Sequence, residues 1–571
     1  AGDATTTASE NVAIGYDALG TNILGSGSVA VGPSALRTQN YGSATNAYNT
    51  AVGMFAGYAV TTAVQNTLIG SFAGNAITTG GFNTAVGYLS GTAITTGTGN
   101  AFFGLRAGAG TTTGNANTFV GGSSNSYAGF ANTTGTNNTA VGTDALAANT
   151  TASNNVAVGM DALTANTTGT DNAAVGLGAL QTNTTGNSNT AVGRDAGKLN
   201  TTGVQNTFIG AIAGDAITTG SYNAVLGQSA LSSDTLGSSS VAIGHNALGT
   251  QNFTSATDAY NTAVGTLAGL SVTTGIQNTL IGGLAGDAIT TAANNTAVGY
   301  KSLSANTTGA GNTAIGRTAL ENNTTAADSV AVGRAALAQN TTGASNTGVG
   351  SLALNLNTTG AENVAIGGAA MTTATTGFYN TAVGFNSMRL LQTGNDNTAV
   401  GKSALDAITT GFDNVAIGSA SGITNTTGYQ NITIGKDAVS SSATTNGECT
   451  LGNANINNLR CNDTSISSLS DLRDKTNIVD IPLGLNFLNT VRPVSFDWDR
   501  RDGSQAGKKD FGFIAQELKV AADATIYADH MRLVCEENPD RLEADPMKMF
   551  PVLVKALQEL SAKNDALEAR L

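Results

Sequence analysis

The sequence predicts an all-β solenoid or β-roll rod of 17-residue coils, followed by a small α+β domain that ends in a coiled-coil helix. Three observations predict this fold. A glycine recurs at a fixed spacing, the residues before it alternate as in a short strand, and the composition changes near Asn462. We therefore expect a rod over 1–462 and a second domain over 463–571, with a terminal helix at about 547–571.

The glycine repeat carries the first of these predictions. Glycine closes motifs of the type Asn-Thr-Ala-Val-Gly at 26 positions, from Gly15 to Gly452. The step is 17 residues, and it becomes 21 at the repeats that end at Gly53, Gly142 and Gly265. One such repeat cannot bury a core, whereas stacked repeats can, so the pattern predicts about 26 coils of a solenoid.

The residues before each glycine read as a strand with two apolar faces. In one coil Thr139 and Val141 share a face, and Ala140 points the other way. Both faces are apolar or small, as in a strand that is buried on both sides. We expect the larger face to fill the coil, together with Leu146, and the alanine face to allow close approach of a neighbour. A second buried face predicts that several rods share an axis, and the sequence alone does not choose between two and three.

The composition excludes several classes of function. The chain has 571 residues, only 11% of them charged, and a net charge of -13, so no basic surface for nucleic acid is expected. No apolar run approaches the ~18–20 residues of a membrane span. The three cysteines, Cys449, Cys461 and Cys535, have neither disulfide-framework nor zinc-site spacing. We therefore expect no metal and no cofactor.

Two stretches carry a family resemblance for the rod. Asn11-Val12-Ala13-Ile14-Gly15 and Ser240-Val241-Ala242-Ile243-Gly244 resemble the head repeats of trimeric autotransporter adhesins. In that family the repeats form a left-handed β-roll that trimerises through the strand bearing this motif, so the resemblance implies a homotrimer. Similar repeats occur in phage tail fibres.

The C-terminal region has conventional globular chemistry. Five of the six prolines, the single tryptophan (Trp498) and 14 of the 25 basic residues lie beyond Thr464. The region contains Ser470-Asp471-Leu472-Arg473-Asp474-Lys475, and later Phe511-Gly512-Phe513-Ile514-Ala515-Gln516-Glu517-Leu518. From about Ser468 to Leu571 it resembles the intramolecular chaperone domain of phage endosialidases and tail fibres.

That resemblance implies a specific chemistry. In the family the domain trimerises, nucleates folding of the upstream fibre and then cuts itself off before a serine. Carried over, the cleavage site is Leu469–Ser470, Ser470 is the nucleophile and Lys475 is the base. The enzymatic activity is then at most a single-turnover Ser–Lys self-cleavage. Without the resemblance, a turn-capping serine and a solvated lysine are the favoured explanation of these two residues.

The last residues have a heptad-like spacing. Positions stepping by 4, 3, 4, 3 and 4 are apolar except for one asparagine: Leu553, Leu557, Leu560, Asn564, Leu567 and Leu571. This spacing predicts a trimer seam in which one polar residue sets the register. The alternative is a single amphipathic helix packed on its own domain.

Together these features predict a structural fibre and host-attachment protein of the virion tail. Its expected partners are two further copies of the chain, the phage tail or baseplate, and a host cell-surface receptor, either a glycan or a surface protein. The alternative is a bacterial surface adhesin. An ice-binding solenoid is disfavoured because adjacent threonines such as Thr150 and Thr151 point to opposite faces. A glycan-cleaving enzyme is disfavoured because no carboxylate pair recurs.

The three 21-residue coils are the candidate receptor-binding loops, because protruding loops on a rigid scaffold are common recognition sites. The alternative is that their extra residues only add steric bulk. They cover Arg37–Tyr48, the stretch around Tyr127–Thr136, and Gly249–Tyr260. Each concentrates aromatic residues: Tyr41, Tyr48, Tyr127, Phe130, Phe253 and Tyr260.

Overall fold

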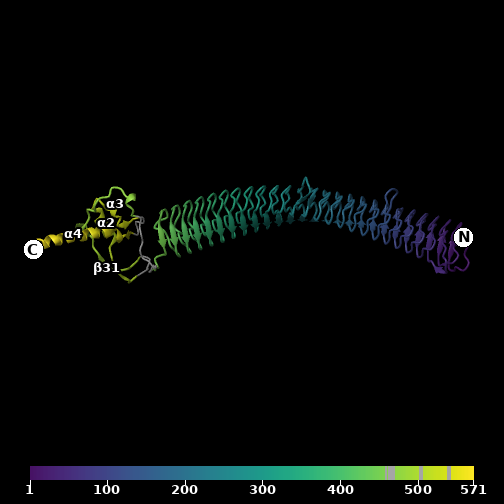
Figure 1. Ribbon diagram of the computed structural model, residues 1–571, viewed down its shortest axis with the longest axis horizontal. Helices are drawn as coiled ribbons and strands as arrows, with labels where there is room; N and C mark the ends of the chain where they lie inside the picture. The colour runs from purple at the N-terminus through teal and green to yellow at the C-terminus, as the bar shows by residue number, and fades with distance from the viewer. Residues whose placement is uncertain (457–459, 461–469, 501–505, 537–541) are drawn as a thin grey trace. The chain divides into compact units, whose positions relative to one another are not determined.

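The computed structural model describes residues 1–456, 460, 470–500, 506–536 and 542–571. The chain divides into two compact units, Ala1–Glu362 and Asn363–Leu571. Within the described residues, 26 three-residue strands carry the glycine motif, 20 in the first unit and six in the second. The predicted β-solenoid of about 26 coils at 17-residue spacing is confirmed (Figure 1).

The coil strands of the first unit are β1 (Val12–Ile14), β3 (Val29–Val31), β5 (Thr50–Val52), β6 (Thr67–Ile69), β7 (Thr84–Val86), β8 (Ala101–Phe103), β9 (Thr118–Val120), β10 (Thr139–Val141), β11 (Val156–Val158), β12 (Ala173–Val175), β13 (Thr190–Val192), β14 (Thr207–Ile209), β15 (Ala224–Leu226), β17 (Val241–Ile243), β19 (Thr262–Val264), β20 (Thr279–Ile281), β21 (Thr296–Val298), β22 (Thr313–Ile315), β23 (Val330–Val332) and β24 (Thr347–Val349). Those of the second unit are β25 (Val364–Ile366), β26 (Thr381–Val383), β27 (Thr398–Val400), β28 (Val415–Ile417), β29 (Ile432–Ile434) and β30 (Cys449–Leu451).

Neighbouring coil strands within each unit pair in parallel and without a shift. Ala140 of β10 lies opposite Ala157 of β11, for example. Equivalent side chains therefore stack in columns, one residue per coil. Ala140 is fully buried, whereas Val141 is 36% exposed. The expectation that the larger face fills the coil is therefore wrong: the coil is so thin that alanine fills it, and the β-branched side chains face outward.

The invariant glycines have two physical causes. At Gly159 the backbone has φ of +134°, a conformation that residues with a Cβ rarely adopt. A Cβ at this position would also lie 2.7 Å from the carbonyl carbon of Gly176 in the next coil. Glycine thus meets both a torsional and a steric requirement, which explains why no other residue occupies the position.

Asparagine ladders connect the coils through the interior. Asn138 Oδ1 accepts hydrogen bonds from both the backbone N–H of Asn155, at 3.1 Å, and Asn155 Nδ2, at 3.3 Å. Asn155 Nδ2 also donates to the Gly169 carbonyl, at 2.9 Å. In a second buried column Asn149 Nδ2 donates to Asn132 Oδ1, at 2.8 Å. These bonds satisfy amides that would otherwise be costly to bury.

Two core positions of the coil have complementary sizes: the middle residue of the strand and the residue four positions after the invariant glycine. Phe208 replaces the usual alanine in β14 and is fully buried. Its ring lies against Gly197 and Gly214, where an added Cβ would overlap the ring. Two coils earlier the strand residue is Ala174, and Leu180 occupies the position equivalent to these glycines. A phenylalanine at the strand position therefore requires glycine at the other.

The 21-residue coils carry extra local structure. The first contains β4 (Thr45–Asn46), which pairs with β2 (Gly25–Ser26). The third contains β18 (Thr257–Asp258), which pairs with β16 (Gly237–Ser238). In the second, Gly122 and Tyr127 form an antiparallel bridge that closes a small hairpin.

The rest of the second unit forms the predicted small α+β domain. It contains η1 (Leu472–Asp474), α1 (Leu485–Leu488), β31 (Val494–Asp497), β32 (Lys509–Gly512), α2 (Ala515–Asp523), α3 (Ala528–Met531), β33 (Val534–Cys535), β34 (Glu543–Ala544), η2 (Pro546–Met549) and α4 (Phe550–Glu568). Two antiparallel pairs form, β31 with β32 and β33 with β34. The expected boundary at 462/463 lies outside the described residues and stays a prediction. Within the described ranges no helix is both long and apolar enough to cross a bilayer.

Candidate functional site

A single turn of 3-10 helix brings Ser470 and Lys475 together. The Asp471 carboxylate caps η1 by accepting the backbone N–H of Arg473, at 2.9 Å, and the N–H of Lys475 closes the turn onto Leu472 O. The five-residue separation then places Lys475 Nζ 2.5 Å from Ser470 Oγ and 3.3 Å from Ser470 O. The two predicted catalytic groups are therefore in direct contact.

The neighbouring charges hold this turn. The Arg473 guanidinium donates to both oxygens of Asp471, at 3.0 and 2.6 Å. This hydrogen bonding lowers the pKa of the Asp471 carboxyl and raises that of Arg473. Asp471 thus stays ionised and keeps the cap that positions Lys475.

A lysine amine within hydrogen-bond distance of a serine hydroxyl is the arrangement that a nucleophile–base pair requires. Both Ser470 and Lys475 are exposed in the single chain. Leu469, whose carbonyl belongs to the predicted scissile bond, lies outside the described residues. The assignment of the cleavage site therefore stays a prediction.

The domain that carries this turn has its own core. Phe487, Leu518, Met531, Leu533 and Val552 are buried together. Helix α4 also reaches α1, because Glu559 Oε2 accepts the backbone N–H of Leu485 at 2.9 Å. Sequence reasoning missed this carboxylate, which caps α1 from 74 residues away and left no local signal.

The other face of α4 is uncovered. Val552 and Ala556 pack inward, while the predicted seam points to solvent: Leu553 is 48% exposed, Leu557 69%, Leu560 51% and Leu567 58%. Leu571 lies beyond the end of α4 and is fully exposed. Asn564 is also exposed, and its amide donates to Glu568 at 3.2 Å. All six seam positions are thus exposed in the single chain.

The first and third predicted receptor loops each bury one aromatic ring. Tyr41 is 6% exposed and its hydroxyl donates to Ala63 O at 2.5 Å; burial raises its pKa to about 12. Phe253 is 4% exposed. These two rings belong to the core, whereas Tyr48 and Tyr260, at 52% and 57%, are exposed.

The second predicted loop presents its rings together. Tyr127 and Phe130 have ring centroids 5.2 Å apart, and the Arg106 guanidinium lies 5.4 Å from the Tyr127 centroid. Phe130 is 40% exposed. Four of the six predicted aromatic residues therefore reach the surface at least in part.

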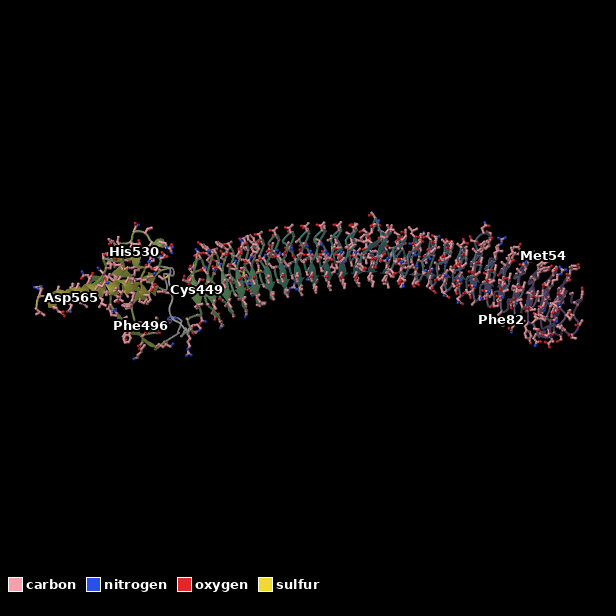
Figure 2. All side chains as sticks on the ribbon, in the orientation of Figure 1. Met54, Phe82, Cys449, Phe496, His530 and Asp565 are labelled. Atoms are coloured by element: carbon pink, nitrogen blue, oxygen red, sulfur yellow. The ribbon has the colours of Figure 1, made fainter. Side chains whose placement is uncertain are left out.

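Other apolar side chains also reach solvent along the coils. Met54 and Phe82, labelled in Figure 2, are 41% and 61% exposed. Sequence reasoning missed a further group, Phe378, Phe412 and Tyr429, which occupies one position of the repeat. Aligning the coils at that position reveals the group in the sequence. Among the residues described, no cluster of three or more His, Cys, Asp or Glu side chains is suited to a metal ion.

Comparison with known proteins agrees with the C-terminal assignment. Residues 470–529 match the family model described as the chaperone of endosialidase. No curated protein matches the chain. A β-solenoid combined with this domain fits the class of phage tail fibres that carry a C-terminal chaperone domain.

Proposed function

We propose that the chain is a structural fibre and host-attachment protein of a phage tail, folded and trimerised by a C-terminal intramolecular chaperone that cleaves itself before Ser470. The match of residues 470–529 to the chaperone of endosialidase carries this proposal. The contact between Ser470 and Lys475 supports the cleavage step. The uncovered faces described above support the trimer.

The cleavage step is an acyl transfer within the chain. The neutral amine of Lys475 accepts the hydroxyl proton of Ser470, and Oγ attacks the carbonyl carbon of Leu469. The C–N bond to Ser470 breaks, the proton passes to the departing amine, and water hydrolyses the resulting ester. Because burial disfavours a charged ammonium, trimer contacts that cover this exposed turn would favour the neutral amine that can accept the proton. Cleavage would then follow assembly.

Two surfaces would join the three chains. The residue before the invariant glycine is aliphatic in every coil except that of Phe103, and it faces outward, as with Ile281 at 39% and Ile315 at 40% exposure. The leucines of α4 form the second surface. Exposed apolar columns of this length mark an interaction site on a solenoid.

The cleavage proposal is tested by denaturing gels and intact mass of the full-length chain. The wild type should release a fragment of about 10 kDa, the proportional share of 56.8 kDa for residues after Leu469. Ser470→Ala should abolish this fragment, and Lys475→Met should slow its release by about 10²-fold or more. Asp474→Asn, an exposed neighbour in the same turn, serves as the control and should cleave normally. A fragment from Ser470→Ala would show that another group is the nucleophile.

A further inference from the structure

One coil position gathers aromatic residues in a single region. It lies six residues before the invariant glycine. Across the 26 coils it is otherwise small, polar or aliphatic, and it is aromatic only at Phe378, Phe412 and Tyr429, with Asn395 between the first two. These four residues belong to four consecutive coils. The concentration is therefore a property of this part of the solenoid and not of the repeat.

The next position supplies hydrogen-bonding groups beside the rings. It holds Tyr379, Asp396, Asp413 and Gln430. Backbone bonds tie the two columns together: Asp396 N–H donates to Phe378 O at 3.2 Å, and Gln430 N–H donates to Phe412 O at 3.1 Å. We call these eight residues the aromatic–acid platform.

The rings of the platform are exposed and are not part of the core. Phe378 is 41% exposed, Tyr379 52%, Phe412 40% and Tyr429 37%. Phe412 and Tyr429 stack with centroids 4.8 Å apart and an angle of 4° between their planes. Phe378 and Tyr379 meet edge to face at 5.1 Å. A gathering of exposed aromatic rings on a solvated surface marks a binding site.

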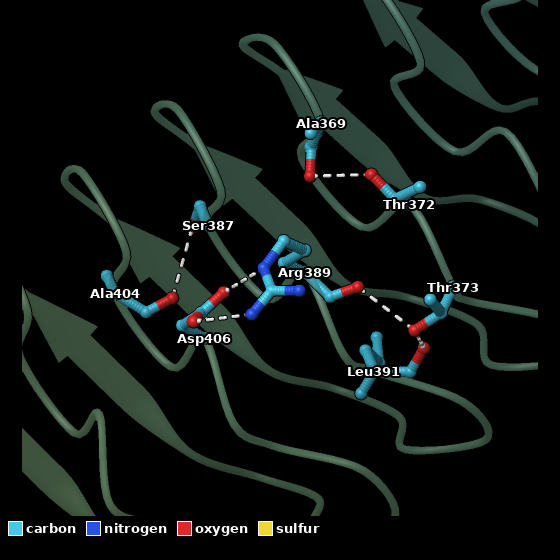
Figure 3. Close-up of polar contacts among 8 residues, drawn as sticks. All are labelled: Ala369, Thr372, Thr373, Ser387, Arg389, Leu391, Ala404 and Asp406. Atoms are coloured by element: carbon cyan, nitrogen blue, oxygen red, sulfur yellow. Dashed lines mark hydrogen bonds and ion pairs between the residues drawn. The ribbon is translucent and has the colours of Figure 1, made fainter.

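Side-chain bonds join neighbouring coils in this part of the solenoid. Figure 3 shows Arg389 joining two of them, with Nε 2.9 Å from Asp406 Oδ1 and a terminal nitrogen 3.1 Å from Oδ2. Thr373 Oγ1 donates to the Arg389 and Leu391 carbonyls, both at 2.9 Å (Figure 3). A rigid scaffold lowers the entropic cost of binding.

We propose that the aromatic–acid platform binds a neutral glycan laid along the coils. Phe412 and Tyr429 cover each other's inner face, so the C–H groups of a pyranose would meet their outer faces and exposed edges, while carboxylate groups accept hydrogen bonds from its hydroxyls and amide groups accept and donate them. Each successive coil repeats the two positions, which suits a chain of sugar units. This inference rests on the proposed host-attachment function and names the class of its ligand.

The charges on the platform select against other ligands. Asp396 and Asp413 lie between the rings and would repel sialylated, sulfated or phosphorylated chains. A protein partner would have to desolvate the same two carboxylates within an apolar interface, which is costly without matched cations. A neutral ligand rich in hydroxyl groups can pack on the aromatic rings and donate hydrogen bonds to the two carboxylates.

The test is binding of the fluorescently labelled full-length chain to an array of immobilised neutral oligosaccharides with sialylated and sulfated counterparts. We expect binding to neutral glycans, and a loss of about tenfold or more in affinity for Phe412→Ala/Tyr429→Ala, as expected for two stacking rings. Asp396→Asn/Asp413→Asn should admit acidic glycans. Phe385→Ala is the matched control, since this ring is 55% exposed but lies one residue after Gly384; it should bind as the wild type does.

Three results would overturn the inference. One is a wild type that attaches to bacterial cells and binds no neutral glycan, which leaves host attachment intact and removes only the ligand class. The second is an equal loss in Phe385→Ala. The third is a changed oligomeric state of Phe412→Ala/Tyr429→Ala by light scattering, which would place the rings in the trimer interface. Binding to neutral glycans by a chain that attaches to no cell in a broad bacterial panel would support the site and count against host attachment.

Discussion

Asp234 is a carboxylate in a column of buried amides. It is fully buried and accepts the N–H of Gly237 at 3.0 Å and Gln251 Nε2 at 2.7 Å. Burial raises its pKa above the ordinary 3.8, although these hydrogen bonds lower it in part. The equivalent residue 212 positions earlier is Asn22, which makes the same bond to the N–H of Gly25 at 3.0 Å.

We predict that Asp234→Asn stabilises the chain at neutral pH. A raised pKa means that the fold favours the protonated acid, so its contribution to stability is complete below pH 3.8 and is lost as the pH rises through the folded-state value. The amide removes that loss, worth on the order of 1–3 kcal/mol for a buried polar group. Thermal unfolding between pH 3 and 8 should show a flatter profile. Asn22→Asp should steepen the profile, because a second buried carboxyl would also lose stability as the pH rises, and an unchanged profile in both variants would contradict the prediction.

At the scale of residues, the repeat predicted the invariant glycine, and the family resemblance singled out Ser470 and Lys475, which lie in contact; their catalytic roles stay a prediction. It did not predict which strand face is interior, because alternation assigns Ala140 and Val141 to opposite faces without saying which face turns inward. Which face turns inward depends on how much space the coil encloses, and that space is set only when the coils stack. Tyr41 and Phe253 were expected at the surface for a similar reason, since an inserted segment either protrudes or folds back.

At the scale of the single coil, complementary volumes set stability. Phe208→Ala leaves a void and should lower stability by about 3–5 kcal/mol. Gly214→Leu should also destabilise, because the new side chain overlaps the Phe208 ring. The combination reproduces the alanine–leucine pairing of Ala174 and Leu180, so we predict that the double variant is more stable than the sum of the two losses.

Circular dichroism during heating measures this coupling. The control pairs Gly214→Leu with Phe119→Ala, a fully buried ring in a distant coil that lies against Gly129. This control should be additive within about 0.5 kcal/mol. A coupling of similar size in both pairs would show that the gain does not come from the direct contact between positions 208 and 214.

Helix α4 shows what local sequence can and cannot predict. Its heptad spacing indicated the seam, and Leu557 and Leu560 indeed face solvent. The helix was expected over about 547–571. It begins at Phe550, directly after a separate 3-10 turn, and ends at Glu568. Its contact to α1 through Glu559 depends on tertiary structure and had no local signature.

At the scale of the whole molecule, the outward aliphatic column should decide assembly. We predict that Ile281→Lys/Ile315→Lys converts the proposed trimer into a single chain of 56.8 kDa, because charges opposed across an apolar interface cannot be desolvated. Light scattering coupled to size exclusion measures the mass. The control Gln277→Lys/Asn294→Lys adds the same charge at exposed positions outside the column and should stay trimeric. A trimer in both variants would place the interface elsewhere.

The architecture could be predicted from the repeat and the change in composition, because each coil is a short local unit that can fold in only a few ways. The oligomeric state and the ligand-binding surface were harder to predict from the sequence. The aromatic–acid platform becomes visible only when four coils are superposed, and the receptor itself leaves no trace in the chain.

The pairing of Phe208 with Gly197 and Gly214 has a further consequence. Identical coils would stack equally well after a shift of one repeat. The asparagine ladder would form the same hydrogen bonds in the shifted arrangement and would not oppose it. A slip by one coil would bring this ring against a coil without its glycine and leave a void where it had been. The irregular core positions therefore act as addresses: each bulky side chain and its matching gap encode where along the chain a coil belongs.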